Sequence, residues 1–172
     1  MRFGILASIL ALTTLAVAEE VTKAYVDIDA VTSSDELVAV DGFRAAGQPD
    51  ADAFALVAEA GYAAVIDLRG EQENRGLDEA AVLQELGLDY VELPLSSPDA
   101  ISFENAAKLD EILSGYTEPV LIHCGSSNRV GALLALRKSM HGASDDAAVE
   151  YGRDAGLTGL EPVVRSRLSE KE

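Results

Sequence analysis

Short apolar runs alternate with helical patterns along most of the sequence, and this alternation constrains the fold more than any other feature. The predicted strands cover residues 62–69, 89–95 and 119–124, and a strand–turn–strand unit over 37–49 precedes them. The predicted helices cover residues 51–60, 77–86, 102–114, 129–141, 144–155 and 160–170. Strands that alternate with helices form a largely parallel sheet. We therefore expect an α/β fold with a mainly parallel central sheet flanked by helices.

Helix-capping residues support these boundaries. Asp50 and Ser102 each precede a helical pattern and have side chains that accept hydrogen bonds from a first turn. Gly61, Gly87 and Gly115 each close one of the helical patterns. Both signals place helix ends where the apolar periodicity stops.

The N-terminus has the features of a secretory signal. Arg2 precedes an apolar stretch, and Ala16-Val17-Ala18 matches a small-residue cleavage site. We expect a signal peptide over residues 1–18, an N-terminal extension over 19–36, in which "VDIDAV" is a possible edge strand, and the α/β domain over 37–172. The apolar stretch is short for the alternative, an uncleaved anchor helix. The expected location is secreted, or periplasmic in a Gram-negative source.

The charge of the chain excludes several classes of partner. The sequence has 13 Lys and Arg against 30 Asp and Glu, a net charge of −17. Cleavage after residue 18 would remove Arg2 alone and leave 12 against 30, or −18. Such a chain repels nucleic acids and anionic membranes. We expect neither as a partner, and no membrane insertion after signal cleavage.

Cys124 is the only cysteine, and it follows the apolar run "PVLIH" directly. A single cysteine cannot form an intrachain disulfide, so its thiol is either a buried, inert group or a reactive one. Its position favours reactivity, because ligands of parallel sheets bind at the carboxyl ends of strands.

The segment "HCGSSNRV" predicts an anion-binding loop. A strand ends at Cys124 and a helix begins near Arg129, so the backbone N–H groups of residues 125–130 face a common centre. The positive end of the helix favours the thiolate, and the guanidinium of Arg129 can hold two oxygens of an oxyanion. Gly125 permits close approach of a ligand, and Asn128 tolerates a positive φ angle. The predicted substrate-binding set is Gly125, Ser126, Ser127, Asn128 and Val130.

Several segments together resemble a known family. "AGQP", "AAVIDLRGEQE", "GLDYVELPL", "PVLIHCGSSNRVGALLAL" and "YGRDAGL" are similar to the phosphatase-like domain of bacterial beta-lactamase-hydrolase-like proteins, which is related to the dual-specificity and protein tyrosine phosphatases. The resemblance covers about residues 38–168. It implies a protein-tyrosine-phosphatase-like fold, with Cys124 as the nucleophile, Arg129 as the phosphate clamp and His123 as a support for the loop.

The sequence departs from the phosphatase pattern in two places within the loop. Four residues separate Cys124 from Arg129, whereas phosphatases of this kind usually have five, and four is the spacing of rhodanese-type sulfurtransferases. Val130 stands where phosphatases usually have Ser or Thr, and Ser126 or Ser127 either replaces that hydroxyl or simply forms the turn. A sulfurtransferase or persulfide carrier that uses the same loop is therefore the main alternative.

The general acid is a third departure. The Asp expected after "LPL" aligns with Ser97, and Asp99 lies two residues further along the chain. Asp99 either protonates the leaving oxygen from a mobile loop or is simply a solvated surface residue. Arg69 and Arg44 also follow or lie within strands. We expect Arg69 to reach the pocket or, more readily, to pair with Glu71 or Glu73.

These features predict a cysteine-dependent phosphatase-like hydrolase that works through a cysteinyl-phosphate intermediate, with Cys124, Arg129 and Asp99 as catalytic residues. A catalytically inactive anion-binding module is a third hypothesis. The expected partner is a small phosphorylated or sulfur-containing substrate or a phosphoprotein. No metal-ligand or nucleotide-binding pattern is present in the sequence, so no cofactor is expected.

Overall fold

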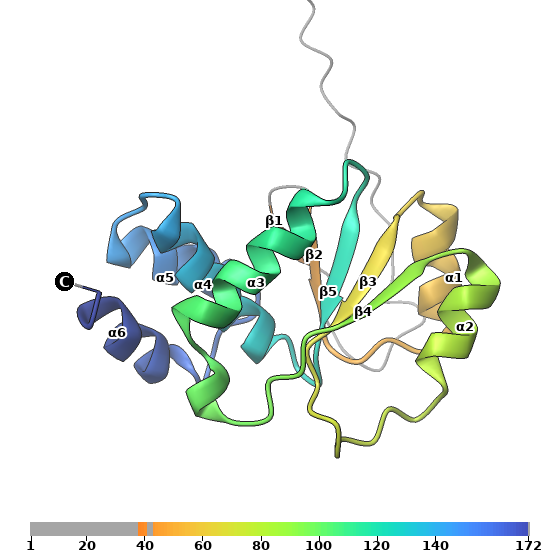
Figure 1. Cartoon of the computed structure of the whole chain (residues 1–172), viewed down its shortest axis with the longest axis horizontal. Coiled ribbons are helices and arrows are strands. Elements are labelled where there is room, and N and C mark those ends of the chain that lie inside the picture. Colours follow the sequence, from red (N-terminus) through yellow and green to blue (C-terminus); the bar gives the residue numbers. More distant parts are fainter. Residues whose placement is uncertain (1–37, 41–42, 172) are drawn as a thin grey trace, which may run out of the picture.

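The computed structural model describes residues 38–40 and 43–171 of the chain (Figure 1). The predicted signal peptide and almost all of the predicted N-terminal extension, including "VDIDAV", lie outside the described residues. For β1 and β2 we describe the backbone only.

A five-stranded sheet forms the centre of the domain, in the order β1-β2-β5-β3-β4. The strands are β1 (Val38–Val40), β2 (Phe43–Ala46), β3 (Ala64–Asp67), β4 (Asp89–Glu92) and β5 (Val120–His123). The pairs β2–β5, β5–β3 and β3–β4 are parallel. The edge strand β1 pairs with β2 in the antiparallel direction. The prediction of a mainly parallel sheet is confirmed.

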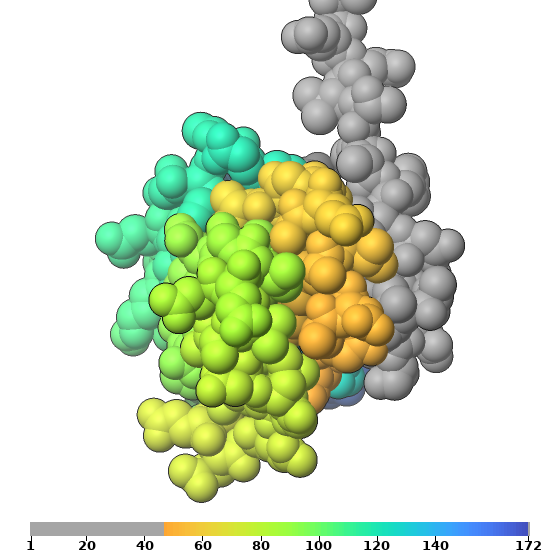
Figure 2. Space-filling model, turned by 90° about the vertical axis from the view of Figure 1, so that its right-hand side faces the viewer, coloured from red at the N-terminus to blue at the C-terminus, as the bar shows by residue number. Residues whose placement is uncertain are grey.

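Helices cover both faces of the sheet (Figure 1). One face carries α1 (Ala51–Glu59) and α2 (Glu79–Leu86), as Figure 2 shows in surface view. The other carries α3 (Phe103–Ser114), α4 (Asn128–Met140), α5 (Asp145–Asp154) and α6 (Glu161–Ser169). A short 3₁₀ helix, η1 (Pro98–Ala100), lies between β4 and α3. Among the described residues, no helix has the length and apolar character needed to span a membrane.

The pleat of the strands divides the core into two clusters. Val65 and Leu121 pack with α1 and α2, whereas Ile66 and Ile122 pack with the helices of the other face. Successive side chains of a strand point to opposite faces. As a result, the strands separate two neighbouring residues of the predicted site, with His123 on the α1–α2 side and Cys124 in the core of the opposite side.

The predicted caps form with small adjustments. Asp50 accepts a hydrogen bond from the backbone N–H of Ala53 at 2.9 Å, and Ser102 accepts one from Asn105 at 3.2 Å. Gly87 closes α2 with φ of 73°. Gly61 is not the cap itself, because Ala60 caps α1 and Gly61 follows it.

Two glycines allow α4 and α5 to approach closely. A Cβ atom on Gly131 would lie 2.4 Å from the carbonyl oxygen of Gly152 and 2.3 Å from the nitrogen of Leu157. Larger side chains there would push the helices apart. This contact fixes α4, the helix that carries Arg129, against the C-terminal part of the domain.

The connections that follow β3, β4 and β5 gather at one edge of the sheet, the lower edge in Figure 1. The connection after β2 joins them there, because Gly47 forms an isolated bridge with Ser126. In Figure 2 the β3–α2 connection projects beyond the same edge. Cys124 follows the last residue of β5 and therefore lies where four connections converge.

Candidate active site

A tight loop of residues 124–127 links β5 to α4. Ser127 has φ of 59°, the only positive φ of a non-glycine among the described residues. The sequence indicated Asn128 as a residue that tolerates this conformation, but Asn128 is the first residue of α4. Its side-chain oxygen instead accepts hydrogen bonds from the backbone N–H groups of Thr158 and Leu160, at 2.9 and 3.2 Å. Asn128 thus ties the loop to the connection between α5 and α6.

Gly156 accommodates the bend at Ser127. It has φ of 93°, and a Cβ atom there would lie 2.4 Å from the Cβ atom of Ser127. Positive φ and close contact both require glycine at this position. Gly156 is therefore part of the structure that shapes the loop, although it lies 32 residues from Cys124.

Cys124 forms the floor of the loop. Its side chain is fully buried, and its Sγ atom accepts a hydrogen bond from the backbone N–H of Ser126 at 3.5 Å. Of the two roles considered for Ser126 and Ser127, a hydroxyl contact to the thiol or turn formation, the contact found comes from the backbone N–H of Ser126. The sulfur therefore has no exposed surface in this conformation, and contact with a ligand requires the loop above it to yield.

Arg129 extends from the first turn of α4 and lies beside Cys124. Its Nη2 atom donates to Glu73 Oε2 at 2.7 Å, and its Nη1 atom contacts Glu73 Oε1 and donates to the carbonyl of Leu95 at 3.2 Å. The hydrogen bonds to Glu73 raise the pKa of Arg129 above its usual range, although burial opposes the shift, and Cys124 adds to it. Arg129 therefore remains a cation at any physiological pH.

Glu73 comes from the connection after β3. Its carboxylate also accepts a hydrogen bond from the backbone N–H of Gly70 at 2.7 Å. The hydrogen bond from Arg129 lowers the pKa of Glu73, against an opposing contribution from burial. Its carboxylate occupies the two-pronged position that an oxyanion of a ligand would take on Arg129. Sequence analysis placed Glu73 near Arg69 and missed this pairing.

A pocket of about 240 Å³ opens above the loop. Its walls come from the β4–α3 connection, the Cys124 loop and the start of α6. The lining residues are Leu95, Ser96, Ser97, Pro98, Ser126, Asn128, Arg129 and Leu160. Three of the predicted residues, Ser126, Asn128 and Arg129, therefore line one pocket.

Val130, predicted to bind substrate, has a fully buried side chain in the hydrophobic core. Only its backbone can take part in ligand binding. The core position explains the apolar residue: α4 needs an anchor directly after Arg129, and valine supplies it. This arrangement replaces the hydroxyl residue that phosphatases usually have after the arginine.

Asp99 lies on η1, next to the pocket residue Pro98. Its side chain is 96% exposed, and its carboxylate lies 3.5 Å from Arg167. Asp99 itself is not part of the pocket lining. In this structure the carboxylate points toward α6 rather than toward Cys124.

A network of buried charges lies on the α1–α2 side of the sheet. Arg69 donates to both carboxylate oxygens of Asp67, at 2.9 and 3.0 Å, and contacts Glu79. Arg75 and the hydroxyl of Tyr90 each donate to Asp67 at 3.1 Å. We predicted that Arg69 pairs with Glu71 or Glu73. It pairs instead with Asp67 of β3 and Glu79 of α2. The described residues do not include the side chain of Arg44.

This network favours ionised groups. Burial alone would raise the pKa of Asp67, but the hydrogen bonds from Arg69 and the charge of His123 outweigh it and lower the pKa to about 2. Burial and the nearby carboxylates raise the pKa of Tyr90 above its usual range, against the hydrogen bond from Arg75. Tyr90 therefore keeps its proton and donates a hydrogen bond to Asp67.

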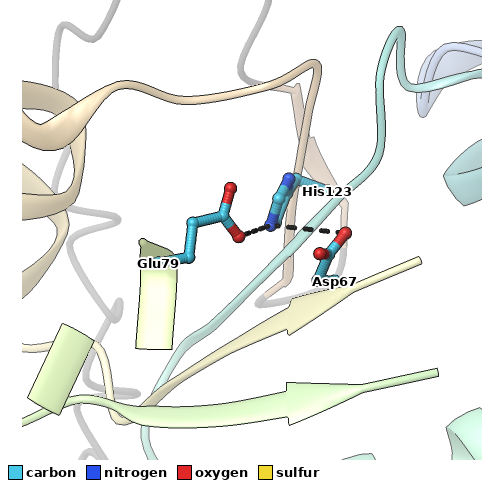
Figure 3. Close-up of side chains that lie close together, drawn as sticks. All are labelled: Asp67, Glu79 and His123. Carbon is cyan, nitrogen blue, oxygen red and sulfur yellow. Dashed lines mark ion pairs between the residues drawn. The ribbon is translucent and has the colours of Figure 1, made fainter. Parts of the chain in front are cut away.

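His123 connects the network to the Cys124 loop (Figure 3). Its Nε2 atom lies 3.4 Å from Glu79 Oε2 and 3.9 Å from Asp67 Oδ1, and its ring packs edge-on against Phe54 with centroids 6.0 Å apart. All three polar side chains are buried. The predicted supporting role of His123 thus has a physical basis, because its ring is held from the face opposite the pocket.

The ligand atoms of Asp67, Glu79 and His123 lie within 4.8 Å of one another, a spacing that a metal ion can bridge. The guanidinium of Arg69 already contacts both carboxylates, and Arg75 contacts one of them. A divalent cation at this place would meet the positive charge of these arginines at short range. The residues fit a network of ion pairs better than a metal site.

The sequence matches one family model, and the fold is similar to several solved structures. A model of the family "DSP-PTPase phosphatase fused to NAD+ Kinase" matches residues 13–159, more than half of the chain. No curated protein matches the sequence.

Solved structures with the same fold include phosphatases. A candidate phosphatase of Neisseria meningitidis has a TM-score of 0.65 and 17% identity, with 76% of this chain and 97% of that chain covered. A candidate phosphatase of the DUF442 group from Shewanella putrefaciens has a TM-score of 0.59 and 21% identity, covering 77% and 85%. The core catalytic domain of the PP-IP phosphatase SIW14 from S. cerevisiae, in complex with citrate, has a TM-score of 0.59 and 17% identity, covering 78% and 86%. These likenesses confirm the predicted tyrosine-phosphatase-like fold.

Proposed function

Because the chain belongs to the family of DSP-PTPase phosphatases fused to NAD+ kinase, we propose that it is a cysteine-dependent phosphatase of phosphate monoesters. The single observation that carries this proposal is that Cys124 lies beside Arg129, the guanidinium that lines the pocket. We also propose that, among phosphatases of this superfamily, the chain is related to the phosphatase-like domain of beta-lactamase-hydrolase-like proteins. The sequence motifs quoted above support this relation.

The reaction proceeds in two steps. In the first, the thiolate of Cys124 attacks phosphorus, an S–P bond forms, and the bond to the leaving oxygen breaks. In the second, water attacks the cysteinyl phosphate, releases inorganic phosphate and restores the thiolate. Arg129 and the backbone N–H groups of the loop hold the equatorial oxygens, where charge develops in both transition states.

Binding of a phosphoryl group requires Arg129 to share or exchange its contacts with Glu73. The pair is partly exposed, at 20% for Arg129 and 38% for Glu73, and Arg129 lines the pocket, so an incoming oxyanion can reach the guanidinium. The two oxygens of Glu73 show the geometry in which a bidentate oxyanion would be held. This mimicry supports a phosphoryl group as the ligand.

Asp99 is the proposed proton donor to the leaving oxygen. It follows Pro98, which lines the pocket, and its contact with Arg167 at 3.5 Å is long and exposed. Rotation of the Asp99 side chain would give up that weak contact. We expect Asp99→Asn to slow esters with poor leaving groups, such as phenyl phosphate, more than 4-nitrophenyl phosphate. Equal slowing of both esters would contradict the assignment.

The decisive experiment compares phosphate transfer with sulfur transfer. We expect the wild type to hydrolyse 4-nitrophenyl phosphate and Cys124→Ser to lose turnover while it still binds vanadate. Mass spectrometry of the wild type after brief exposure to the ester should show a phosphate adduct on Cys124. A persulfide adduct after exposure to thiosulfate, with no phosphate adduct, would favour the sulfurtransferase alternative that the four-residue spacing suggests. Anion binding with neither adduct would favour an inactive binding module.

We further propose that the protein is exported and that the mature chain begins at Glu19. The support is the sequence of residues 1–18 alone. N-terminal sequencing of the protein from the periplasmic fraction of a Gram-negative host tests this. Recovery from membranes with Met1 retained would contradict it.

A further inference from the structure

Resting on the phosphatase function proposed above, we infer that the substrate is a compact monophosphate ester whose remaining part carries no second anionic group. Three observations support this inference: the composition of the pocket, the carboxylate partners of the other described arginines, and the overall charge of the chain. Esters with a further phosphate or carboxylate group would bind less well to the same site.

The pocket offers one positive charge. Of the described residues that line it, Arg129 alone is charged, and the others contribute hydroxyls, one amide and apolar side chains. The neutral polar members are Ser96, Ser97, Ser126 and Asn128. The oxygen of Asn128 is already occupied by Thr158 and Leu160, so its amide group is left to act as a donor. Such a wall suits uncharged hydroxyls of a substrate and provides no counterion for a second phosphate.

The size of the pocket limits the rest of the substrate. Its volume of about 240 Å³ lies below the roughly 300–1,000 Å³ of pockets that enclose drug-sized ligands. The apolar lining residues Leu95, Pro98 and Leu160 narrow it from two sides. A phosphoryl group together with a few carbon atoms fits this space.

Within the part of the chain whose side chains are described, the other arginines are already paired with carboxylates. Every arginine whose side chain the structure describes has a carboxylate partner within 4.0 Å. Arg167, the cation beside η1, contacts both Asp99 and Glu170 and donates to the carbonyl of Ile101. A second phosphate would therefore have to displace a carboxylate to reach a cation, and that exchange gives little net attraction.

The overall charge acts in the same direction. The chain carries a net charge of −17, and Glu73 places one negative charge directly at the clamp. Repulsion grows with the charge of the ligand and is screened by salt over about 10 Å at 0.1 M ionic strength. Discrimination against doubly anionic ligands should therefore weaken as salt is added, whereas discrimination caused by shape would not change.

The test measures binding of a matched three-carbon series to the Cys124→Ser protein by calorimetry at low salt. The series is glycerol 3-phosphate, 3-phosphoglycerate and 2,3-bisphosphoglycerate, in which a carboxylate and then a second phosphate are added. We expect the dissociation constant to rise about fivefold or more with each added anionic group and the differences to shrink in 0.5 M NaCl. Tighter or equal binding of 2,3-bisphosphoglycerate, or no binding of glycerol 3-phosphate at 50 mM, would overturn the inference.

Two variants show whether charge at the pocket is responsible. Ser97→Lys, which adds a cation to the pocket wall, should improve binding of 2,3-bisphosphoglycerate relative to glycerol 3-phosphate. Thr117→Lys makes the same charge change at an exposed position before β5, at the opposite end of the strand, and should leave the ratio unchanged. Equal effects of both variants would overturn a local origin. Failure of the wild type to hydrolyse 4-nitrophenyl phosphate would count against the proposed function and not against this order of affinities.

Discussion

Two arginine–carboxylate pairs lie near Cys124, on opposite sides of the sheet, and their surroundings give them different roles. Arg69 is 1% exposed and is surrounded by Asp67 and Glu79, which are equally buried. Arg129 is 20% exposed, and its partner Glu73 is 38% exposed. The comparison shows that burial, and not residue type, determines which guanidinium can exchange its carboxylate for a ligand.

The reason lies in desolvation. Separating a buried pair leaves an ion without solvent or a partner, which costs several kcal/mol. A partly exposed pair can be separated because water or an incoming oxyanion replaces the lost contact. The Arg69 network is therefore suited to support the Cys124 loop through His123, and the Arg129–Glu73 pair is suited to bind and release an anion.

The largest effect should follow from a change to the buried network. We expect Asp67→Asn to lower the free energy of unfolding by about 3–5 kcal/mol at pH 7, because Arg69 loses its ionised partner. Urea denaturation measures this loss. Glu104→Gln, which removes an exposed partner of Lys108, is the control and should leave the transition unchanged. A loss below 1 kcal/mol for Asp67→Asn would contradict the supporting role of the network.

The same variant has a pH signature. The pKa of Asp67 is about 2 in the folded protein and about 3.9 in an unfolded chain. Because the folded pKa is the lower one, ionised Asp67 contributes its full stability above about pH 4, and that contribution is lost as the pH falls toward 2. The difference in stability between the wild type and Asp67→Asn should therefore shrink over this range.

A change at the exposed pair should affect activity more than stability. We expect Arg129→Lys to reduce kcat/KM for 4-nitrophenyl phosphate by roughly 10²–10³, because lysine keeps the charge but loses the planar pair of donors. Arg165→Lys, at an exposed ion pair on α6, serves as the matched control and should retain wild-type activity. If both variants lost activity equally, Arg129 would have no special role at the reacting group.

The smallest effect should come from Glu73. Glu73→Gln removes a negative charge that competes with or repels a bound oxyanion, so sulfate should bind more tightly, by on the order of fivefold. Titration calorimetry at neutral pH, where Glu73 is ionised, measures the dissociation constant of sulfate. Glu71→Gln, at an exposed neighbour of the same connection, is the control and should have less effect. Weaker sulfate binding in Glu73→Gln would show that Glu73 mainly positions Arg129.

A pH titration sharpens the same comparison. Arg129 holds the pKa of Glu73 below its usual range, so Glu73 becomes neutral only at a lower pH than an ordinary glutamate. As Glu73 becomes neutral, the sulfate affinity of the wild type should rise toward that of Glu73→Gln. The same titration of Glu73→Gln accounts for protonation of sulfate itself, so the difference between the two proteins can be assigned to Glu73.

The sequence alone determined the succession of strands and helices along the chain and the position of Cys124 at the end of a strand. Apolar periodicity predicted the helices and strands because each segment must bury one face, and the spacing of its own apolar residues shows which face that is. The strand end at Cys124, the polar loop and the helix start at Arg129 are adjacent in the chain, so their joint geometry was predictable. Cap residues such as Asp50 and Gly87 fixed the helix ends for the same reason.

Only the tertiary structure decided the partners. Glu73 is 56 residues from Arg129, and Glu79 is 44 residues from His123, so no spacing rule in the sequence links them. Charged side chains are long and have several partners within reach, so Arg69 was assigned to the wrong carboxylates. The pleat of β3 and β5 decides which side chains meet, because it directs Asp67 and His123 to one face of the sheet and the Cys124 side chain to the other. Burial on one face and access to solvent on the other then give similar ion pairs different roles.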